Sequence, residues 1–382
     1  MIYLDNAATS FPKPACMMTA MSECIQKYCG NPGRSGHMYS IRTAQGIYET
    51  RKELADLFGI KDSSRIIFTE NATGAINLGI KGVLKKGDHV ITTSMEHNSV
   101  LRPLKALEDD GVETTIISCN KDGIPDLETI KRSIKDNTKL IVCTHASNVT
   151  GTVMPVKEIG RLAGSKGILL MLDAAQSAGS RRIDVNKLGA DLLAAPGHKG
   201  LLGPQGTGFL YVREGIELKP LKEGGTGTES KSRRQPADFP EGYESGTLNS
   251  PGIMGLKASI RWLKDTGIEN IESHEEELIG ILDEKLRNMN GITVYGPLKA
   301  SEKSAITAFN IAGIGCEETA ERLSKKYGIA VRAGYHCAGL AHKTIGTWDT
   351  GAVRIGVGPF NTKRDIYSAI NAIYKIDRKS VV

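Results

Sequence analysis

The sequence predicts an α/β protein in which helices cover both faces of a mostly parallel sheet, followed by a smaller α+β domain. Two observations support this fold class. Short apolar segments alternate with amphipathic segments between residues 45 and 215, as expected where each strand is followed by a helix. The chain also has 382 residues, which is too long for one small core and favours two or three domains.

Six segments have the apolar and β-branched composition of strands: residues 65–69, 89–93, 114–118, 139–144, 168–173 and 208–212. Amphipathic segments such as 47–58 and 100–109 lie between them and suit helices. In a parallel sheet, ligands bind at the carboxyl ends of the strands. Polar residues just past these ends are therefore the first candidates for function.

The pattern changes in the second half of the chain. Residues 223–232 are rich in Gly, Thr and Ser and predict a loop. A long helix is predicted over residues 271–289, because its acidic residues lie near its start and its basic residues near its end, as the helix dipole favours. We therefore predict a large domain of residues 15–255 and a small C-terminal domain of residues 256–382, joined by residues 1–14.

Composition and charge exclude several classes of protein. Hydrophobic residues make up 40% and charged residues 24% of the chain, as in ordinary soluble globular proteins. The densest basic cluster, 231–234, is more typical of a solvated loop than of a nucleic-acid surface. No apolar run approaches the roughly 20 residues that span a bilayer, and the chain opens on strand-like residues 2–4 rather than on a signal peptide. We expect no nucleic-acid partner and no membrane.

The seven cysteines indicate a reducing compartment. Their number is odd, their spacing is irregular and no CxxC pair occurs, which argues against a disulfide framework and a structural zinc site. We therefore expect a cytoplasmic protein without a metal site, in which most cysteines are small buried hydrophobic residues.

An acid and a lysine follow the most hydrophobic part of the predicted sheet. Asp173 ends the segment Leu170-Met171-Leu172-Asp173, and Lys199 stands between glycines in Gly197-His198-Lys199-Gly200. Alone, Asp173 could be a helix N-cap and Lys199 a surface residue. Together they match pyridoxal phosphate, which needs a lysine for its aldehyde and an acid for its pyridinium nitrogen.

Three other strand ends carry suitable residues. The segment 71–75 opens a helix whose backbone N–H groups could bind a phosphate, although an ordinary capped helix has the same pattern. His97 could stack on a cofactor ring and move protons, or could be a hydrogen-bonded loop histidine. Asn148 could donate to the cofactor ring oxygen or to a substrate carboxylate, or could be a turn residue.

These segments resemble a known family. Residues 3–9 (Tyr-Leu-Asp-Asn-Ala-Ala-Thr), 173–176 and 197–199 resemble enzymes of the class V aminotransferase fold. Residues 331–338 resemble the active-cysteine segment of cysteine desulfurases, closest to the bacterial SUF-type group and to selenocysteine lyases. Residues 353–362 resemble the segment whose arginine binds the substrate carboxylate. The resemblance covers essentially the whole chain and implies a fold-type I pyridoxal-phosphate transferase with a seven-stranded sheet.

Cys337 and Arg354 also suit this chemistry by their own surroundings. Cys337 lies between glycine-containing stretches of little periodicity, which favours a mobile loop, and His336 and Arg332 beside it would favour the thiolate. A buried structural cysteine is the alternative. Arg354 has the fork geometry for a bidentate carboxylate contact, with a surface salt bridge as the alternative.

The resemblance implies a mechanism in which L-cysteine becomes L-alanine. Lys199 holds the cofactor and then removes the α-proton, while Arg354 and Asn148 hold the substrate carboxylate. The Cys337 thiolate takes the substrate sulfur as a persulfide, and His97 serves as the acid that protonates the carbon product. The persulfide then passes to an acceptor protein or a small thiol.

The resemblance also implies further contacts. The Ala72 backbone, Thr73 and His198 should bind the cofactor phosphate, Asp173 the pyridinium nitrogen and Gln176 the ring oxygen. Arg332 is expected to bind substrate. Thr247 should reach the phosphate of a neighbouring copy, and Arg34 should enter from the partner, which implies a homodimer with shared active sites.

The chain departs from the SUF-type pattern at three places. Pro196 stands where relatives often carry a serine that contacts phosphate, and Tyr335 replaces a common histidine. Residues 223–228 differ from the usual glycine-rich hairpin near the active-site entrance. One phosphate contact and the docking of the sulfur acceptor are therefore in doubt.

Other functions remain compatible with parts of the pattern. A selenocysteine lyase would use the same residues on L-selenocysteine. An aminotransferase or lyase for another small amino acid would not need Cys337, and a non-enzymatic sulfur carrier would not need Lys199. A Rossmann dehydrogenase is disfavoured because no GxGxxG follows the first strand. Iron–sulfur cluster assembly, thionucleoside synthesis and selenium metabolism all remain open as destinations of the sulfur or selenium.

Overall fold

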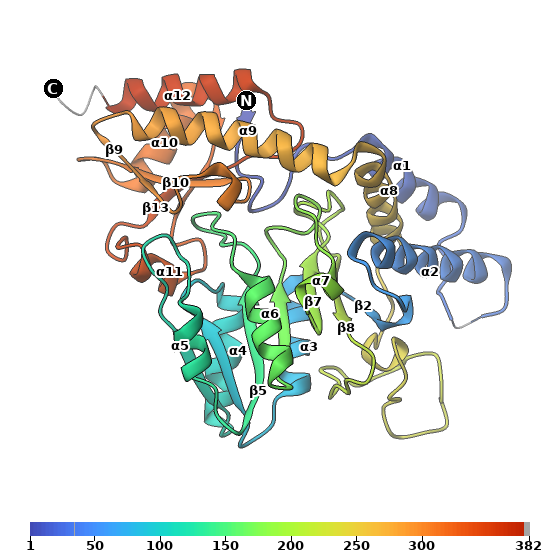
Figure 1. The fold of residues 1–382 in the computed structure, drawn as a ribbon. Helices are drawn as coiled ribbons and strands as arrows, with labels where there is room; N and C mark the ends of the chain where they lie inside the picture. Colours follow the sequence, from blue (N-terminus) through green and yellow to red (C-terminus); the bar gives the residue numbers. More distant parts are fainter. Residues whose placement is uncertain (34, 378–382) are drawn as a thin grey trace.

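Seven strands form the central sheet in the part of the chain that the structure, a computed structural model, describes, namely residues 1–33 and 35–377. The strand order is β2-β8-β7-β6-β5-β3-β4 (Figure 1). The bounds are β2 (Ile66–Thr69), β3 (His89–Thr93), β4 (Glu113–Ile117), β5 (Thr138–Thr144), β6 (Leu169–Asp173), β7 (Leu192–Pro196) and β8 (Gly208–Val212). Only the two pairs that involve β8 are antiparallel among these strands. The predicted mostly parallel α/β sheet is confirmed.

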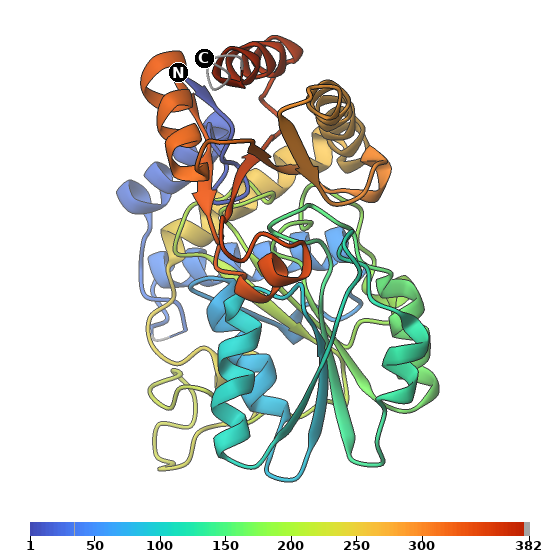
Figure 2. The ribbon, with the colours of Figure 1, turned by 90° about the vertical axis from the view of Figure 1, so that its left-hand side faces the viewer.

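Alternate side chains of each strand enter different cores, as the period of a strand requires. On β6, Leu170 and Leu172 pack into one hydrophobic cluster, whereas Met171 packs into another on the opposite face. Helices cover both faces, with α3 and α4 on one side and α6 on the other (Figure 2). Their bounds are α3 (Ala72–Val83), α4 (Asn98–Asp109), α5 (Leu127–Arg132), α6 (Val156–Ser165) and α7 (Val185–Leu188).

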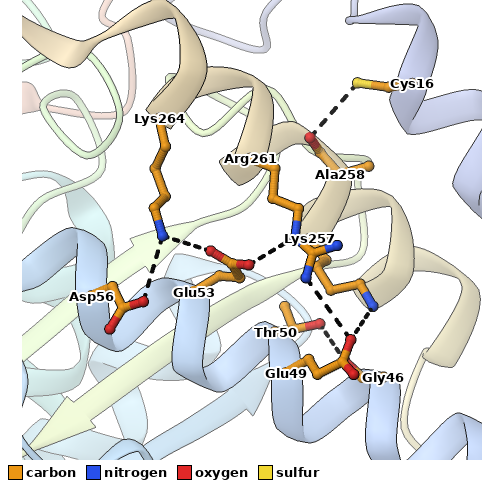
Figure 3. Close-up of polar contacts among 10 residues, drawn as sticks. All are labelled: Cys16, Gly46, Glu49, Thr50, Glu53, Asp56, Lys257, Ala258, Arg261 and Lys264. Atoms are coloured by element: carbon orange, nitrogen blue, oxygen red, sulfur yellow. Dashed lines mark hydrogen bonds and ion pairs between the residues drawn. The ribbon is translucent and has the colours of Figure 1, made fainter.

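Charged residues join two helices that lie beside the sheet, α2 (Met38–Phe58) and α8 (Ser250–Thr266) (Figure 3). Acids at positions 49 and 53 of α2 lie on one helical face, as do the bases at 257, 261 and 264 of α8. Lys257 Nζ lies 2.9 Å from Glu49, and Glu53 accepts from Arg261 and Lys264 at 2.7 Å each. These partly exposed ion pairs add little stability singly, but together they fix the register of α8 on α2.

The C-terminal third forms a second sheet. Its strand order is β12-β13-β10-β9, and every pair is antiparallel. A separate hydrophobic cluster lies between this sheet and its helices, and Leu4 of the N-terminal segment contributes to it. The elements are α9 (Ile268–Arg287), β9 (Ile292–Tyr295), β10 (Ile306–Ile311), α10 (Cys316–Tyr327), β11 (Ile329–Ala330), β12 (Arg332–Gly334), α11 (Gly339–Thr344), β13 (Ala352–Gly356) and α12 (Lys363–Asp377).

The N-terminal segment reaches this second unit. After β1 (Ile2–Tyr3), which pairs with β11, the chain returns to the large sheet and enters α1 (Ala15–Lys27). Short 3₁₀ turns complete the elements at η1 (Ser63–Arg65), η2 (Glu241–Tyr243) and η3 (Ala300–Glu302). The division into residues 15–255 and 256–382 stays a prediction, and α8 runs across that boundary.

Three observations concern the expected environment. No helix among residues 1–33 and 35–377 is long and apolar enough to cross a membrane. Each of the seven cysteines, all in the described part of the chain, is a free thiol, and three of them, Cys24, Cys143 and Cys316, are buried. The expectation that most of the cysteines are buried is therefore wrong. Within that same part, no group of three or more His, Cys, Asp or Glu side chains is placed to hold a metal ion.

Candidate active site

A cavity lies past the carboxyl ends of the parallel strands. Most of the predicted cofactor residues line it, although they come from five different strand ends. Its lining consists of Asn71, Ala72, Thr73, Ile76, His97, Ser99, Thr144, Asn148, Asp173, Ala175, Gln176, Pro196, His198 and Lys199.

Asp173 stands at the end of β6, where the buried apolar run meets the cavity. Its side chain is buried, and Oδ1 accepts a hydrogen bond from the Ala175 N–H at 2.9 Å. Burial raises the pKa of this carboxyl, while that hydrogen bond and the Lys199 charge lower it. A cationic or N–H partner in the cavity would therefore be bound strongly, because it would relieve the cost of a buried carboxylate.

Lys199 follows β7, the strand next to β6. The turn that carries it is tight, since a Cβ at Gly197 would lie 2.1 Å from Thr207 Oγ1. Burial lowers the pKa of Lys199 from 10.5 to about 8, with Arg354 and Arg332 acting in the same direction and Asp173 opposing them. A substantial share of this amine is therefore neutral, and nucleophilic, near physiological pH.

The imidazole ring of His97 caps the N-terminus of α4. The Ser99 N–H donates to His97 Nδ1 at 3.0 Å, and the Ser99 hydroxyl lies 2.8 Å from the same nitrogen. Because a backbone N–H can only donate, Nδ1 carries no proton and the neutral ring has its proton on Nε2. The Ser99 hydroxyl in turn contacts Thr73 Oγ1 at 2.9 Å. Burial, with Lys199 and nearby arginines, lowers the pKa of His97 to about 4.

The N-terminus of α3 forms an anion site beside these groups. Asn71 caps the helix by accepting from the Gly74 N–H at 2.9 Å, which leaves the Ala72 and Thr73 end of the helix at the cavity. Backbone N–H groups at a helix start bind phosphate. Next to it, His198 Nδ1 is buried without a hydrogen-bond partner in the described structure, and burial lowers the pKa of His198 to about 4. This unpartnered nitrogen fits a ligand group that the chain itself does not supply.

Cys337 lies in a turn that connects the second sheet to the cavity wall. His336 and Cys337 both have left-handed backbone angles, with φ of 51° and 58°. The Asn98 N–H donates to the Cys337 carbonyl at 2.8 Å, and Asn148 Nδ2 donates to the His336 carbonyl at 2.6 Å. The sequence favoured a mobile loop, whereas the structure ties both carbonyls of this turn to the large sheet.

Of the two residues expected beside the Cys337 thiol, Arg332 is the one whose side chain approaches the sulfur. The Cys337 thiol is exposed, and Arg332 Nη2 lies 3.9 Å from its sulfur. His336 points inward, with its Nδ1 3.4 Å from His342 Nε2. Burial lowers the pKa of His336 to about 2, so this ring is neutral and supplies no positive charge.

Arg354 projects from β13 and is only 1% exposed. Nη1 donates to the Asn148 carbonyl at 2.8 Å, and Nη2 donates to Asp5 Oδ1 at 3.0 Å. Asn148 therefore contacts Arg354 through its carbonyl and the Cys337 turn through its side chain. This residue brings the predicted substrate arginine and the predicted nucleophile to one wall of the cavity.

Comparison with known proteins identifies the family. The aminotransferase class-V family model matches residues 2–368. The chain belongs to the aminotransferase class-V family. A probable cysteine desulfurase of Methanothermobacter thermautotrophicus is 38% identical over 372 residues, which cover 96% of this chain and 92% of that protein. A cysteine desulfurase of Haloferax volcanii is 31% identical, over 98% of this chain and 88% of that protein.

Solved structures agree with this assignment. The apo structure of a cysteine desulfurase from Thermococcus onnurineus NA1 matches with a TM-score of 0.94 at 33% identity, over 99% of this chain and 95% of that one. The cysteine desulfurase CsdA of Escherichia coli matches with a TM-score of 0.86 at 30% identity, over 98% and 94% of the two chains. Class-V aminotransferases depend on pyridoxal phosphate in general, and the predicted fold-type I architecture is confirmed.

Among the described residues of this class-V chain, the predicted cofactor residue Thr247 does not line the cavity. Thr247 lines a different hollow, with Phe68, Tyr243 and Glu244. Arg34 lies outside the described residues. Their proposed roles both involve a second copy of the chain, and they stay predictions.

Sequence reasoning missed two residues of the class-V site. Ser99 links His97 to Thr73, and its only signal was its place in the segment after a strand end. Asp5 pairs with Arg354 from 349 positions away. Its segment carried the family resemblance, but no local pattern indicates that its carboxylate meets an arginine of β13.

Proposed function

We propose that this chain is a pyridoxal-phosphate-dependent cysteine desulfurase, which converts L-cysteine to L-alanine and takes the sulfur as a persulfide on Cys337. One observation carries the proposal. The exposed Cys337 turn is hydrogen-bonded to Asn98 and Asn148, the second of which also lines the cavity that holds Lys199 and Asp173. Similar proteins named cysteine desulfurase over nearly the full length support the same activity.

The cavity residues fit pyridoxal phosphate. When bound, this cofactor supplies an aldehyde for amino groups and a ring that withdraws negative charge from the α-carbon. Asp173 would hold the proton of the ring nitrogen, and Lys199 would supply the amine. The start of α3 and the unpartnered nitrogen of His198 would hold the phosphate. Gln176 lines the same cavity and is proposed to contact the ring oxygen.

The chain's own groups divide the reaction between them. Arg354 binds the substrate carboxylate through N–H groups that the protein leaves free. Lys199 takes the α-proton. The Cys337 thiolate attacks the substrate sulfur, so a sulfur–sulfur bond forms as the bond from that sulfur to Cβ breaks. The α-carbon regains the proton that Lys199 removed, and the electron pair released at Cβ takes up a second proton, which together give alanine. His97 is neutral, so it must receive that proton before passing it on.

A second copy of the chain is proposed to complete the site. Apolar side chains on α1 and α2 are exposed, and a protein interface would remove them from water. They are Met18, Ile25, Met38, Tyr39, Ile41 and Tyr48. In the proposed homodimer, Thr247 reaches the phosphate of the neighbour and Arg34 enters the neighbour's substrate site. Light scattering after size exclusion measures the mass that decides this.

The remaining features of the function rest on the family. L-Cysteine is the proposed substrate, with L-selenocysteine as the second candidate. The sulfur acceptor is proposed to be a protein or a small thiol that reaches the exposed Cys337, and iron–sulfur cluster assembly is one destination of the sulfur. The proposed location is the cytoplasm, where thiols stay reduced.

Absorbance and product analysis test the proposal. Purified protein should take up pyridoxal phosphate with a band near ~410–430 nm and should release alanine from L-cysteine. Cys337→Ala should keep the band and lose alanine formation, while Cys29→Ala, which changes another exposed thiol, should keep both. A coloured protein whose alanine yield ignores Cys337 would overturn the mechanism, and a protein that binds no cofactor would overturn the function.

A further inference from the structure

Arg354 is held from two directions by acceptors of the protein. A guanidinium has five N–H donors, and two of them are used, by the Asn148 carbonyl on Nη1 and by Asp5 Oδ1 on Nη2. Nε is buried without a partner in the described part of the chain. The two contacts fix the plane of the guanidinium, and the hydrogen bonds between Arg354 and the protein use no other N–H of this group among the described residues.

Asp5 is itself fixed by β13, the strand that carries Arg354. The Gly356 N–H donates to the Leu4 carbonyl at 2.7 Å, and the Asn6 N–H donates to the Gly356 carbonyl at 3.1 Å. The N-terminal segment can lie this close to β13 only because residue 356 is glycine, since a Cβ at Gly356 would lie 2.8 Å from the Ala7 nitrogen. Backbone pairing with β13, rather than a flexible loop, therefore fixes the position of the Asp5 carboxylate next to Arg354.

The same segment also holds the main chain of Lys199. The Ser10 hydroxyl donates to the Lys199 carbonyl at 2.9 Å, and Lys13 Nζ donates to the His198 carbonyl at 2.6 Å. Residues 5–13 thus contact the group that would bind the carboxylate of an amino acid and the residue that would react at its amino end. The distance between these two groups is what an amino-acid site must fix.

We propose that Asp5 is a positioning residue, which orients Arg354 for the carboxylate of the amino-acid substrate without contacting the substrate. This inference rests on the proposed function, because that function makes the ligand an α-amino acid. The Asp5 side chain is 21% exposed and that of Arg354 is 1% exposed, so the pair is largely shielded from solvent. Without Asp5, the buried guanidinium would keep its charge with one acceptor fewer and could turn about its stem.

Two substitutions at Asp5 test whether the contact acts through orientation. Asp5→Ala should raise the KM for L-cysteine by about tenfold or more, as expected for losing a hydrogen bond to a charged group, and change kcat by less than about threefold. Asp5→Asn keeps an oxygen that can accept from Arg354 and should recover most of the loss. Asp265→Ala, at an exposed aspartate of α8, is the control. An unchanged KM in Asp5→Ala, or equal damage in Asp5→Asn, would overturn the proposal.

Binding calorimetry separates this role from a general folding defect. L-Alanine and L-alaninamide share the amino group, but only L-alanine has a carboxylate. Asp5→Ala, loaded with pyridoxal phosphate, should bind L-alanine about tenfold more weakly and alaninamide almost unchanged. Equal weakening of both ligands would overturn the proposal.

Binding and product formation by the wild-type protein distinguish failure of the proposed function from failure of the role proposed for Asp5. If it binds L-alanine but releases no alanine from L-cysteine, the proposed function fails while the calorimetry still decides the role of Asp5. If it binds neither L-alanine nor L-cysteine, both ideas fail.

Discussion

Lys199 of the cofactor-free protein should lose its proton near pH 8. Burial lowers the pKa of this lysine from 10.5 to about 8, with Arg354 and Arg332 acting in the same direction. At pH 7, about one Lys199 in eleven is then neutral, against about one in 3,000 for a lysine with the ordinary value. The neutral fraction, which is the form that attacks an aldehyde, is therefore larger by about 300-fold.

Competitive acetylation at a series of pH values measures this directly. The labelling rate of Lys199, read by mass spectrometry of its peptide, should rise with pH and level off above about pH 8–9. Lys166, which is exposed at the end of α6, is the reference in the same sample. A Lys199 rate that rises in parallel with the reference beyond pH 10 would refute the reasoning.

Two variants should move the midpoint pH of Lys199 labelling in opposite directions. The Asp173 charge raises the pKa of Lys199, so Asp173→Asn should shift the midpoint to lower pH. The Arg354 charge lowers that pKa, so Arg354→Met should shift it to higher pH. Shifts of the same sign in both variants would mean that the charges around the amine are not arranged as described.

Two further predictions concern stability, and urea unfolding measures both. Gly160→Ala should lower the free energy of unfolding by about 1–3 kcal/mol, because a Cβ there would lie 2.0 Å from the Leu188 carbonyl oxygen. Gly164→Ala on the same helix meets nothing within 4 Å and should not destabilise, so equal losses in the two variants would contradict this packing. Asp283→Ala should lower the free energy of unfolding by about 3–5 kcal/mol, because it leaves the fully buried ammonium of Lys303 without its carboxylate partner. Replacing both by Leu and Met should cost much less, and a loss below about 1 kcal/mol in the single variant would refute this.

Local composition predicted most of the large sheet but not all of it. The segments predicted at 89–93 and 208–212 coincide with β3 and β8, because β-branched and aromatic residues form them. The strand β7 was missed, since Leu-Leu-Ala-Ala-Pro contains no β-branched residue and ends in proline. Its strand geometry comes from burial between β6 and β8, which is a property of the whole sheet.

The site could be predicted where chain order and spatial order coincide. Asp173 and Lys199 follow β6 and β7, which are neighbours in the sheet, so their strand ends meet. The pairing of Asp5 with Arg354 arises from the return of the N-terminal segment to β13, and no spacing in the sequence encodes it. The role proposed for Thr247 involves a second copy of the chain, which no pattern within one chain can place.

The turn at Cys337 has a strained backbone that hydrogen bonds from the rest of the protein stabilise. Two consecutive non-glycine residues in left-handed conformation, His336 and Cys337, cost about 1–3 kcal/mol each. Glycine would relieve this strain, but the turn uses both side chains, the imidazole inward against His342 and the thiol outward. Hydrogen bonds from Asn98 and Asn148 to the two carbonyls offset the cost. Since both residues follow strands of the large sheet, the sheet that positions the proposed cofactor residues also positions the thiol of the proposed nucleophile.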